Sequence, residues 1–503
     1  MSDVNLSRRA IVQGGAALVV GCDRGGPAAT NFAAEDDSAG WMSLLVQSER
    51  GGRDYSARIE GQLPQALMGT LYRNGGGLYE RDGFRKAYAV DGDGLIQQLQ
   101  IADGTALYKN AFVKTPKFIA EENAGQFLYS TWTTRRPGGV WNNFGGGEIL
   151  SQAGVMVYPI GDKIIALDEV NPGFRINEET LNTESALWIG GETQGSNNKA
   201  HAKFDPRRRE WIIPGQGFGR KPENFAFVYS EDGKLKRTHR FECPRSIYFH
   251  DFLVTEKYFI FVLHPAEFSP AGFLLGTRSI AESLKWRPEK GNLIALCPRE
   301  GGAPIYLDAP AAFMWHALNA YQIGENVIAD FVGFDVPDHF IGPNPMLKTM
   351  MSGKMGQAQV PGKVRRYHIE VQKRRLREEI VDAGNHEFPI LDPQFSLQKH
   401  RYGYFSSGGL GGLNAGVKRV DFESGTHDNF HFGDHAHVGE PIFVPHPDGI
   451  ADKGWLIAQC LDGHRAQSFF AVFETSSIAQ GPVAKIWLEH VAPLSFHGCW
   501  VSA

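Results

Sequence analysis

From about Trp41 onward the chain alternates between short apolar runs and turn residues. Each run is of strand length and is bounded by Gly, Pro, Asp or Asn, which is typical of β-strands. The clearest runs are residues 154–158, 163–167, 257–263, 292–296, 326–331 and 454–458. The 59 glycines and 27 prolines of the 503-residue chain supply many turns between them. The pattern therefore predicts an all-β fold.

Amphipathic helices are few in this pattern. Two short helices are predicted, at residues 279–286 and at residues 345–355, and the second contains Met346, Met350, Met351 and Met355. So many strands in one chain are typical of a β-propeller or a large β-sandwich. No clear repeat of blade length decides between the two. Length alone suggests two or three domains, but closed all-β folds often exceed that size as one domain.

The first 40 residues have a different character. Arg8 and Arg9 precede a small-residue apolar stretch, residues 14–21, and this resembles a twin-arginine export signal. Residues 19–22 also resemble a lipobox, in which Cys22 would carry the lipid. The stretch is shorter than the ~20 residues of a spanning helix. We predict a signal and linker at residues 1–40, a folded domain at residues 41–503, and a periplasmic or exported protein. A lipid anchor on Cys22 is a further alternative, and without a working signal the protein would be cytoplasmic.

Charge and cysteine content exclude several classes of function. The formal net charge is −5 and the sequence pI is about 6.4, so the chain has no basic footprint for nucleic acid. The five cysteines lie far apart without a C-x-x-C pair, and their number is odd. They predict neither a zinc site nor a complete disulfide framework.

Of the 17 histidines, one group is clustered in the sequence: His427, His431, His435 and His437. The spacing of His435 and His437 would put both on one face of a strand, where two ligands can chelate a metal. The alternative is a polar, solvated strand face before a turn. We favour the solvated face.

Four other histidines, His201, His250, His316 and His497, have apolar or aromatic neighbours in the sequence. A polar ring in such surroundings needs a partner. Their separations, from dozens of residues to well over a hundred, rule out a local chelate. They can still converge if each one lies at the end of the inner strand of a different blade.

Beyond these four sites, three further motifs stand out: Gly69-Thr70-Leu71-Tyr72-Arg73-Asn74-Gly75, Asp91-Gly92-Asp93-Gly94 and Glu440-Pro441-Ile442-Phe443-Val444-Pro445. Together with the four histidine motifs, in the same order, they resemble the carotenoid cleavage oxygenases. This family includes bacterial apocarotenoid oxygenases, lignostilbene dioxygenases and the isomerase of the retinal pigment epithelium. The resemblance runs from about Gly61 to Trp500.

The resemblance implies a seven-bladed β-propeller with a small, partly helical dome over its top face. It implies iron(II) on the propeller axis, held by His201, His250, His316 and His497. It also implies that Glu169, Glu387 and Glu440 lie behind these ligands. A carboxylate on the second ring nitrogen fixes the tautomer and the direction of a ligating histidine.

The activity that the resemblance implies is oxidative cleavage of a carbon–carbon double bond, with molecular oxygen, to two carbonyl products. No side chain is expected to act as nucleophile or acid, because metal and oxygen carry the chemistry. The expected substrate is a carotenoid or apocarotenoid. The alternatives are a stilbene- or phenylpropanoid-cleaving dioxygenase on the same scaffold and an exported, non-catalytic propeller that binds a pigment or lipid.

The sequence departs from the family pattern at three places. The usual Asn-Gly-Pro is Asn74-Gly75-Gly76, Val155 stands where many members have a threonine near the open iron site, and Phe112 stands where stilbene-cleaving members hold the phenol with a tyrosine. Phe112 favours a less polar substrate. The apolar residues 273–275 and the methionines of residues 346–355 are candidates for an entrance that touches a membrane, with a lipidated Cys22 as a second contact.

Overall fold

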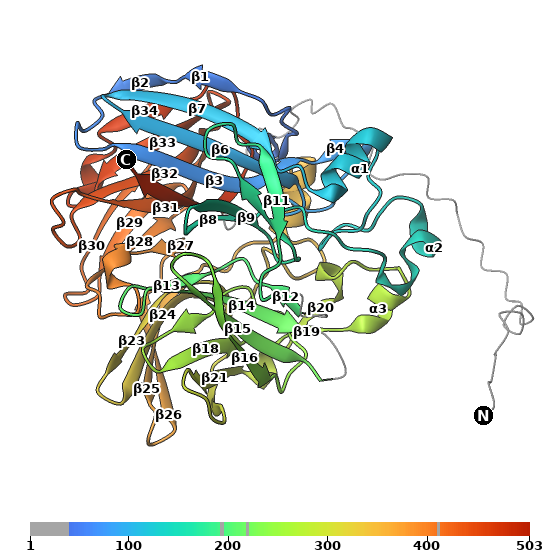
Figure 1. Ribbon diagram of the computed structural model, residues 1–503, viewed down its shortest axis with the longest axis vertical. Coiled ribbons are helices and arrows are strands. Elements are labelled where there is room, and N and C mark those ends of the chain that lie inside the picture. The colour runs from blue at the N-terminus through green and yellow to red at the C-terminus, as the bar shows by residue number, and fades with distance from the viewer. Residues whose placement is uncertain (1–39, 192–195, 218–220, 410–412) are drawn as a thin grey trace, which may run out of the picture.

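The strands are arranged as seven blades around a central axis (Figure 1). The structure, a computed structural model, describes residues 40–191, 196–217, 221–409 and 413–503. Within these residues seven sheets have four or five strands, and two more sheets have two strands each. The predicted all-β, seven-bladed propeller is confirmed. The predicted export signal and Cys22 lie outside the described residues.

The blades follow one another along the chain, except where the two ends meet. In sheet order, the first blade consists of β1 (Asp54–Ser56), β7 (Thr105–Phe112), β6 (Asp93–Ala102), β3 (Gly69–Leu78) and β35 (Ser495–Ser502). The second consists of β11 (Thr183–Leu187), β10 (Gly173–Ile176), β9 (Lys163–Leu167) and β8 (Met156–Ile160). The third consists of β12 (Ser196–Asn198) and β13 (Lys203–Asp205), both paired with β14 (Glu210–Gly217), then β15 (Glu223–Ser230) and β16 (Leu235–Glu242).

The remaining four blades complete the ring. The fourth consists of β17 (Leu253–Val254), β18 (Tyr258–Leu263), β21 (Asn292–Pro298) and β22 (Ile305–Ala309), and the fifth of β23 (Phe313–Ile323), β24 (Asn326–Phe334), β25 (Lys363–Glu370) and β26 (Arg375–Asp382). The sixth consists of β27 (His386–Ile390), β28 (Tyr402–Ser407), β29 (Gly416–Asp421) and β30 (His427–His431). The seventh consists of β2 (Arg58–Gly61), β34 (Ala484–Trp487), β33 (Gln467–Glu474), β32 (Gly454–Asp462) and β31 (Ala436–Pro445). Neighbouring inner strands touch, β35 with β8 and β31, and β27 with β31 and β23.

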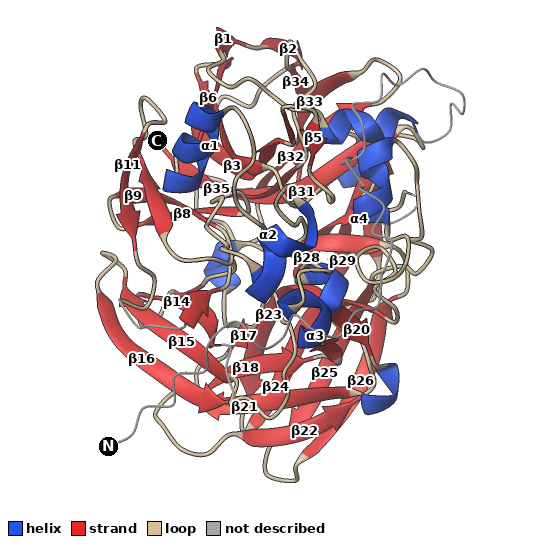
Figure 2. Ribbon diagram, turned by 90° about the vertical axis from the view of Figure 1, so that its right-hand side faces the viewer, coloured by secondary structure: helices blue, strands red, loops and turns tan. Residues whose placement is uncertain are grey.

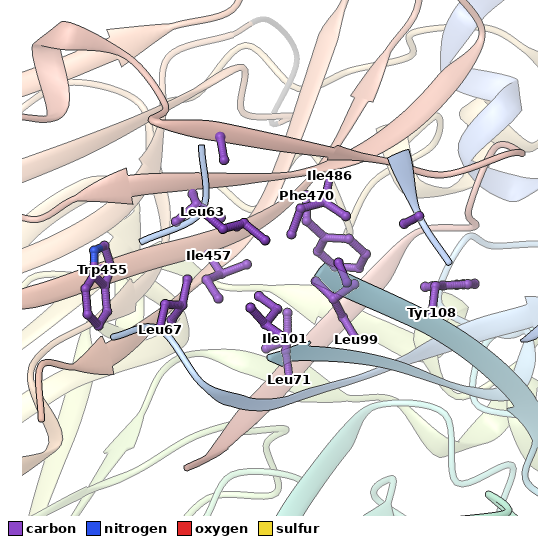
Figure 3. Close-up of a cluster of buried hydrophobic side chains, with 14 of the residues drawn as sticks. Leu63, Leu67, Leu71, Leu99, Ile101, Tyr108, Trp455, Ile457, Phe470 and Ile486 are labelled. Carbon is purple, nitrogen blue, oxygen red and sulfur yellow. The ribbon is translucent and has the colours of Figure 1, made fainter. Parts of the chain in front are cut away.

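The ring is closed by strands from both ends of the chain. β35 pairs with β3 in the first blade, and β2 pairs with β34 in the last. In Figure 1 the blue and red ribbons therefore lie side by side. A buried apolar cluster fills the space between these two blades (Figure 3). Leu71, Leu99 and Ile101 come from one blade, and Ile457 and Phe470 from the other.

Short helices form the cover on one side of the propeller, the side that faces the viewer in Figure 2. They are α1 (Pro116–Ala124), α2 (Gly139–Asn143), α3 (Pro270–Leu274) and α4 (Met346–Thr349). The 3₁₀ turns are η1 (Gly40–Val46), η2 (Phe144–Gly146), η3 (Ala281–Ser283), η4 (Pro288–Lys290), η5 (Met350–Ser352), η6 (Pro393–Phe395) and η7 (Ile478–Gln480). Among the described residues no helix has the length and apolar character to span a bilayer.

One of the two predicted helices is present in the structure, and the other is mostly not. Residues 345–355 contain α4 and η5, and the helical stretch ends where Gly353 adopts a left-handed conformation, with φ of 73°. Residues 279–286 are helical only at η3. Leu284–Trp286 form the strand β20, which pairs with β19 (Ala266–Phe268), so the helix prediction was wrong there. Pairing with a neighbouring strand overrode the local helical pattern.

Arg73 on β3 is fully buried and joins three strands. Its guanidinium donates to the backbone carbonyl of Glu440 at 2.7 Å, to that of Phe496 at 3.1 Å, and to Ser495 Oγ at 3.0 Å. Its Nη1 also lies 3.5 Å from the Glu440 carboxylate. The charged group therefore ties β3 to β31 and β35, the strands of the two closing blades.

Replacing Arg73 with leucine should strongly destabilise the ring closure. The substitution leaves two buried carbonyls and a carboxylate without their donor, and breaking such a pair typically costs about 3–5 kcal/mol. A lower denaturant midpoint should show this loss. Arg207→Leu is the matched control, because the Arg207 side chain is 65% exposed and pairs with Glu256 at the surface. An equal loss in both variants would contradict the role of Arg73.

Candidate metal centre

The four predicted histidines come from four blades and converge on the axis. His201 lies between β12 and β13, His250 lies just before β17, His316 lies on β23, and His497 lies on β35. The ladders shift register at His316 and next to His497. Such irregularities re-aim side chains next to active sites. The inner strands are therefore interrupted where they must turn a ring toward the axis.

The four rings form a tight, buried group. His201 Nε2 lies 3.0 Å from His250 Nε2, and His316 Nε2 lies 3.1 Å from His497 Nε2. One ring nitrogen from each of the four lies within 4.8 Å of the others. All four residues are buried. The structure thus brings together all four histidines that the sequence singled out.

Three carboxylates stand behind three of these rings. Glu169 Oε1 lies 2.5 Å from His250 Nδ1, and Glu440 Oε1 lies 2.9 Å from His497 Nδ1. Glu387 makes the same contact with His316 Nδ1. All three glutamates are buried, and they are the three named from the sequence. His201 makes no such contact with a carboxylate among the described residues.

The arrangement fits a cation between the rings. A carboxylate only accepts, so it holds the proton on Nδ1 and leaves the lone pair on Nε2. The Nε2 atoms of His316 and His497 therefore face each other as two acceptors, 3.1 Å apart. Burial, then the neighbouring histidines, lower the pKa of His201 and of His497 well below its usual value. Neutral nitrogens at this spacing are the donor set of a divalent metal ion.

Electrostatics also hold the carboxylates in place. Burial raises the pKa of Glu440 to about 7, against the pull of Arg73. Burial also opposes ionisation of Glu169, but Lys199 and His250 outweigh it and lower its pKa. Nearby positive charge therefore favours the ionised form of both glutamates, and a divalent ion on the axis would add to it.

The histidine cluster of residues 427–437 does not join this group. His427 and His431 are exposed on β30, and His435 is half-buried. The prediction of a solvated strand face is correct for these three residues, but it was wrong for His437. That residue is the second of the inner strand β31, where it is buried and lines the cavity on the axis.

A largely apolar cavity of about 170 Å³ adjoins the four converging histidines, His201, His250, His316 and His497, which form the metal-capable group. A single ordered water needs about 10–15 Å³ on such a scale, so the space suits an organic molecule. His250, His316 and His497 reach its wall, as do Glu169 and Glu387. Its aromatic lining is Trp132, Tyr248, Trp315, Phe334, Phe340, Phe388 and Phe496. Val155 lines the cavity as well. Phe112 does not, and its ring stacks on Phe118 at 5.2 Å.

The comparisons with known proteins agree with this geometry. The family model described as retinal pigment epithelial membrane protein matches residues 46–502. The chain belongs to this family, that of the carotenoid cleavage oxygenases.

Among the relatives of the chain, the apocarotenoid-15,15'-oxygenase of Synechocystis is 27% identical over 94% of the chain and 98% of the relative. The isoeugenol monooxygenase of Pseudomonas nitroreducens is 26% identical over 89% and 94%. The cobalt-substituted Synechocystis apocarotenoid oxygenase superimposes with a TM-score of 0.86 at 26% identity, covering 92% and 98% of the two chains.

The motifs of the family now have physical roles in the fold. Asn74 donates to the carbonyls of Ala153 and Met156, at 2.8 and 2.9 Å, and so joins β3 to the second blade. Asp91 accepts from Thr131 Oγ1 at 2.7 Å and positions the cavity wall. Gly76 packs against Gly92 so closely that a Cβ on Gly76 would lie 2.8 Å from the Cα of Gly92 and 2.6 Å from the Tyr79 hydroxyl. A proline at position 76, the usual family residue, is therefore not compatible with this packing.

Lys199 is one functional residue that the sequence analysis missed. It is buried, its Nζ lies 3.0 Å from Glu169 Oε2, and the same ammonium lies 4.5 Å from the Tyr248 ring centre. Tyr248 in turn donates to Glu169 Oε1 at 3.0 Å. A lysine two residues before a histidine ligand was a visible signal, but its partner is 30 positions away.

Phe388 is a second missed residue. It has φ of 50°, a left-handed conformation that is strained for a bulky side chain and costs about 1–3 kcal/mol. Its ring stacks on His316 at 5.0 Å, and its backbone N–H donates to Glu387 Oε2 at 2.6 Å. The strain therefore lies where one residue must cover a ligand ring while its neighbour supports the same ring.

Lys199→Met should destabilise the protein, because it leaves the Glu169 carboxylate buried without its cation. Removing one partner of a buried ion pair typically costs about 3–5 kcal/mol. Thermal unfolding of the metal-free protein measures the loss. The double variant Lys199→Met, Glu169→Gln should recover part of it, since no unpaired charge remains. A double variant less stable than the single one would contradict the pairing.

Proposed function

We propose that this chain is a non-haem iron(II) dioxygenase that cleaves a carbon–carbon double bond of a carotenoid or apocarotenoid. The observation that carries the proposal is the four-histidine group at the wall of an apolar cavity. Both atoms of one oxygen molecule would enter the products, one on each carbonyl. The reaction then needs no further reductant.

The choice of iron rests on the family and on the donor set. Imidazole nitrogens accept iron, zinc and copper alike. The Synechocystis relative is named an oxygenase and also has a cobalt-substituted form, so that protein binds a metal. Iron(II) on His201, His250, His316 and His497 would supply the activation of oxygen.

The protein's own contribution is placement and protection. Glu169, Glu387 and Glu440 each hold one ligand ring in a fixed orientation, so that the site is preorganised. Phe388, Trp315 and Tyr248 surround the ligands with aromatic faces on which a conjugated substrate can lie. The apolar wall keeps bulk water away from the reacting bond.

A second candidate function is cleavage of an aromatic alkene. Two relatives are named isoeugenol monooxygenase, and another, from Aspergillus fumigatus, is named resveratrol cleavage oxygenase. The argument from Phe112 against such substrates loses its basis, because Phe112 lies outside the cavity lining. A purely pigment- or lipid-binding propeller is the least favoured alternative, since all four ligands and all three carboxylates are in place.

The proposal predicts that His250→Ala abolishes iron binding and turnover. His427→Ala is the matched control, because His427 is exposed and lies outside the metal-capable group. Anaerobically reconstituted proteins would be given an apocarotenal, a hydroxystilbene and isoeugenol, with mass detection of the aldehydes. Aldehyde from the apocarotenal supports the first candidate. Products from the aromatic alkenes alone would overturn it in favour of the second, and full activity of His250→Ala would remove the metal assignment.

We further propose that the protein contacts a membrane through an apolar surface patch of α2, η2 and α3. Trp141 and Phe144 are 88% and 63% exposed, and Val140, Leu274 and Leu275 are exposed beside them. α3 contacts η2, and Figure 2 shows α2 and α3 together on the helical side. The cavity-lining residues 131–133 and 149–150 flank the α2–η2 segment in sequence. Export and a lipid on Cys22 would complement this patch.

The double variant Trp141→Glu, Phe144→Glu should weaken binding to neutral phospholipid vesicles by tenfold or more, since burying each large apolar side chain contributes about 1.5–3 kcal/mol. Trp188→Glu is the control, because Trp188 is 52% exposed and follows β11 of the second blade, outside α2, η2 and α3. Co-sedimentation measures the bound fraction. Equal losses in both proteins, or none, would contradict a membrane role for the patch.

A further inference from the structure

One buried histidine in the cavity wall has a role that the metal centre does not use. His339 lies in the segment between β24 and α4, is 6% exposed, and lines the cavity beside the metal-capable group. It is not one of the four converging histidines. Its ring packs against Phe334 at 4.4 Å and is held in an aromatic wall.

Trp315 fixes which nitrogen of His339 carries the proton. The indole Nε1 donates to His339 Nε2 at 2.5 Å. An indole N–H can only donate, so His339 Nε2 must be the acceptor and Nδ1 must carry the hydrogen. Burial, with a further contribution from His316, lowers the pKa of His339 to about 3, so the ring is neutral.

The Nδ1–H of His339 is therefore a buried donor, and no protein group accepts its hydrogen among the described residues. Leaving a buried donor unsatisfied costs about 1–3 kcal/mol. Nearly all buried polar groups in proteins have a partner, so a ligand that fills the cavity is expected to provide one here.

His437, the other cavity histidine without a well-placed partner, is a weaker candidate. The Asn414 backbone carbonyl lies close enough to favour its protonated form, and that carbonyl also accepts from Val438 N–H at 2.7 Å. Its ring also borders a second, much smaller cavity. Neither its tautomer nor the direction of its free nitrogen is fixed, whereas Trp315 fixes the tautomer of His339.

We infer that His339 Nδ1 donates a hydrogen bond to an oxygen atom of the substrate, so that the enzyme selects alkenes carrying a carbonyl, hydroxyl or ether oxygen over plain hydrocarbons. This inference rests on the proposed function, because it takes the cavity as the substrate site.

The position of His339 limits where that oxygen lies. The Trp315 ring is 4.9 Å from the His250 ring and 6.1 Å from the His339 ring, which places His339 within about 11 Å of the ligand ring. The oxygen is thus a short distance from the cleaved bond. A phenol across one aromatic ring from the alkene has that reach, as does an aldehyde a few bonds along a polyene.

Two substitutions separate donation by His339 from its contact with Trp315. In His339→Gln the side-chain oxygen can still accept from Trp315 at the Nε2 position, but no donor remains at the Nδ1 position. In His339→Asn the amide nitrogen can replace the Nδ1 donor, while the acceptor for Trp315 is lost. If His339 merely held Trp315 in place, the glutamine variant would be the milder one.

Binding is measured on metal-free protein by quenching of tryptophan fluorescence. One pair of probes is an apocarotenal and the same polyene with methyl in place of the aldehyde. The second pair is isoeugenol and 1-propenylbenzene. For at least one pair, wild type should favour the oxygenated probe by about tenfold more than His339→Gln does, as expected for one lost hydrogen bond. His339→Asn should keep most of the preference.

An unchanged preference in His339→Gln, or a loss in His339→Asn alone, would overturn the inference. Binding of the hydrocarbon probe by each variant shows that its cavity is intact. Because the assay uses neither metal nor turnover, its failure is distinct from failure of the proposed function. A His339-dependent preference in a protein that cleaves no alkene when loaded with iron would support the hydrogen bond from His339 to the bound oxygen and overturn the proposed function.

Discussion

The facing lone pairs of His316 and His497 are the constraint on which the rest of the site depends. Two unprotonated nitrogens 3.1 Å apart in a buried site repel each other unless a cation lies between the rings. When Glu387 and Glu440 are ionised, they hold the protons on both Nδ1 atoms and so turn the two Nε2 lone pairs toward each other. The centre is therefore assembled for a metal, and its neighbours serve to keep four rings in that unfavourable arrangement.

The propeller supplies the rigidity that this arrangement needs. Each ligand comes from a separate blade, so no local flexibility can relax the group. Glu440 is hydrogen-bonded to His497 and also accepts a hydrogen bond from the Arg73 guanidinium. These two contacts link the metal centre to the closure of the ring. Strain is stored at Phe388, next to Glu387, and a buried cation, Lys199, balances Glu169. Stability of the fold and order of the site are thus coupled at the same residues.

Regular patterns in the sequence predicted an all-β fold but did not decide between a propeller and a sandwich. The resemblance to the family supplied the seven blades and joined the four histidines into one site. Strand-length apolar runs predicted β9 with its observed bounds, and apolar flanks singled out His201, His250, His316 and His497. The family motifs then placed the three glutamates. What failed was local: residues 284–286 resembled a helix until pairing with β19 made them a strand.

The roles of Lys199, Phe388 and His339 could not be read from the sequence, because each depends on contacts made only in the fold. The pairing of Lys199 spans 30 positions, and the tautomer of His339 depends on an indole 24 positions earlier. The same holds for His437, which the sequence placed on a solvated face and the fold buries. Tertiary contacts, rather than local pattern, decide these roles.

X-ray absorption of anaerobically reconstituted protein, with metal analysis of the same sample, tests the central claim most directly. The account predicts one ferrous ion per chain, with only nitrogen and oxygen neighbours and the outer scattering pattern of several imidazole rings. A chain that retains no iron after reconstitution would contradict it, as would an ion with sulfur neighbours or without imidazole scattering.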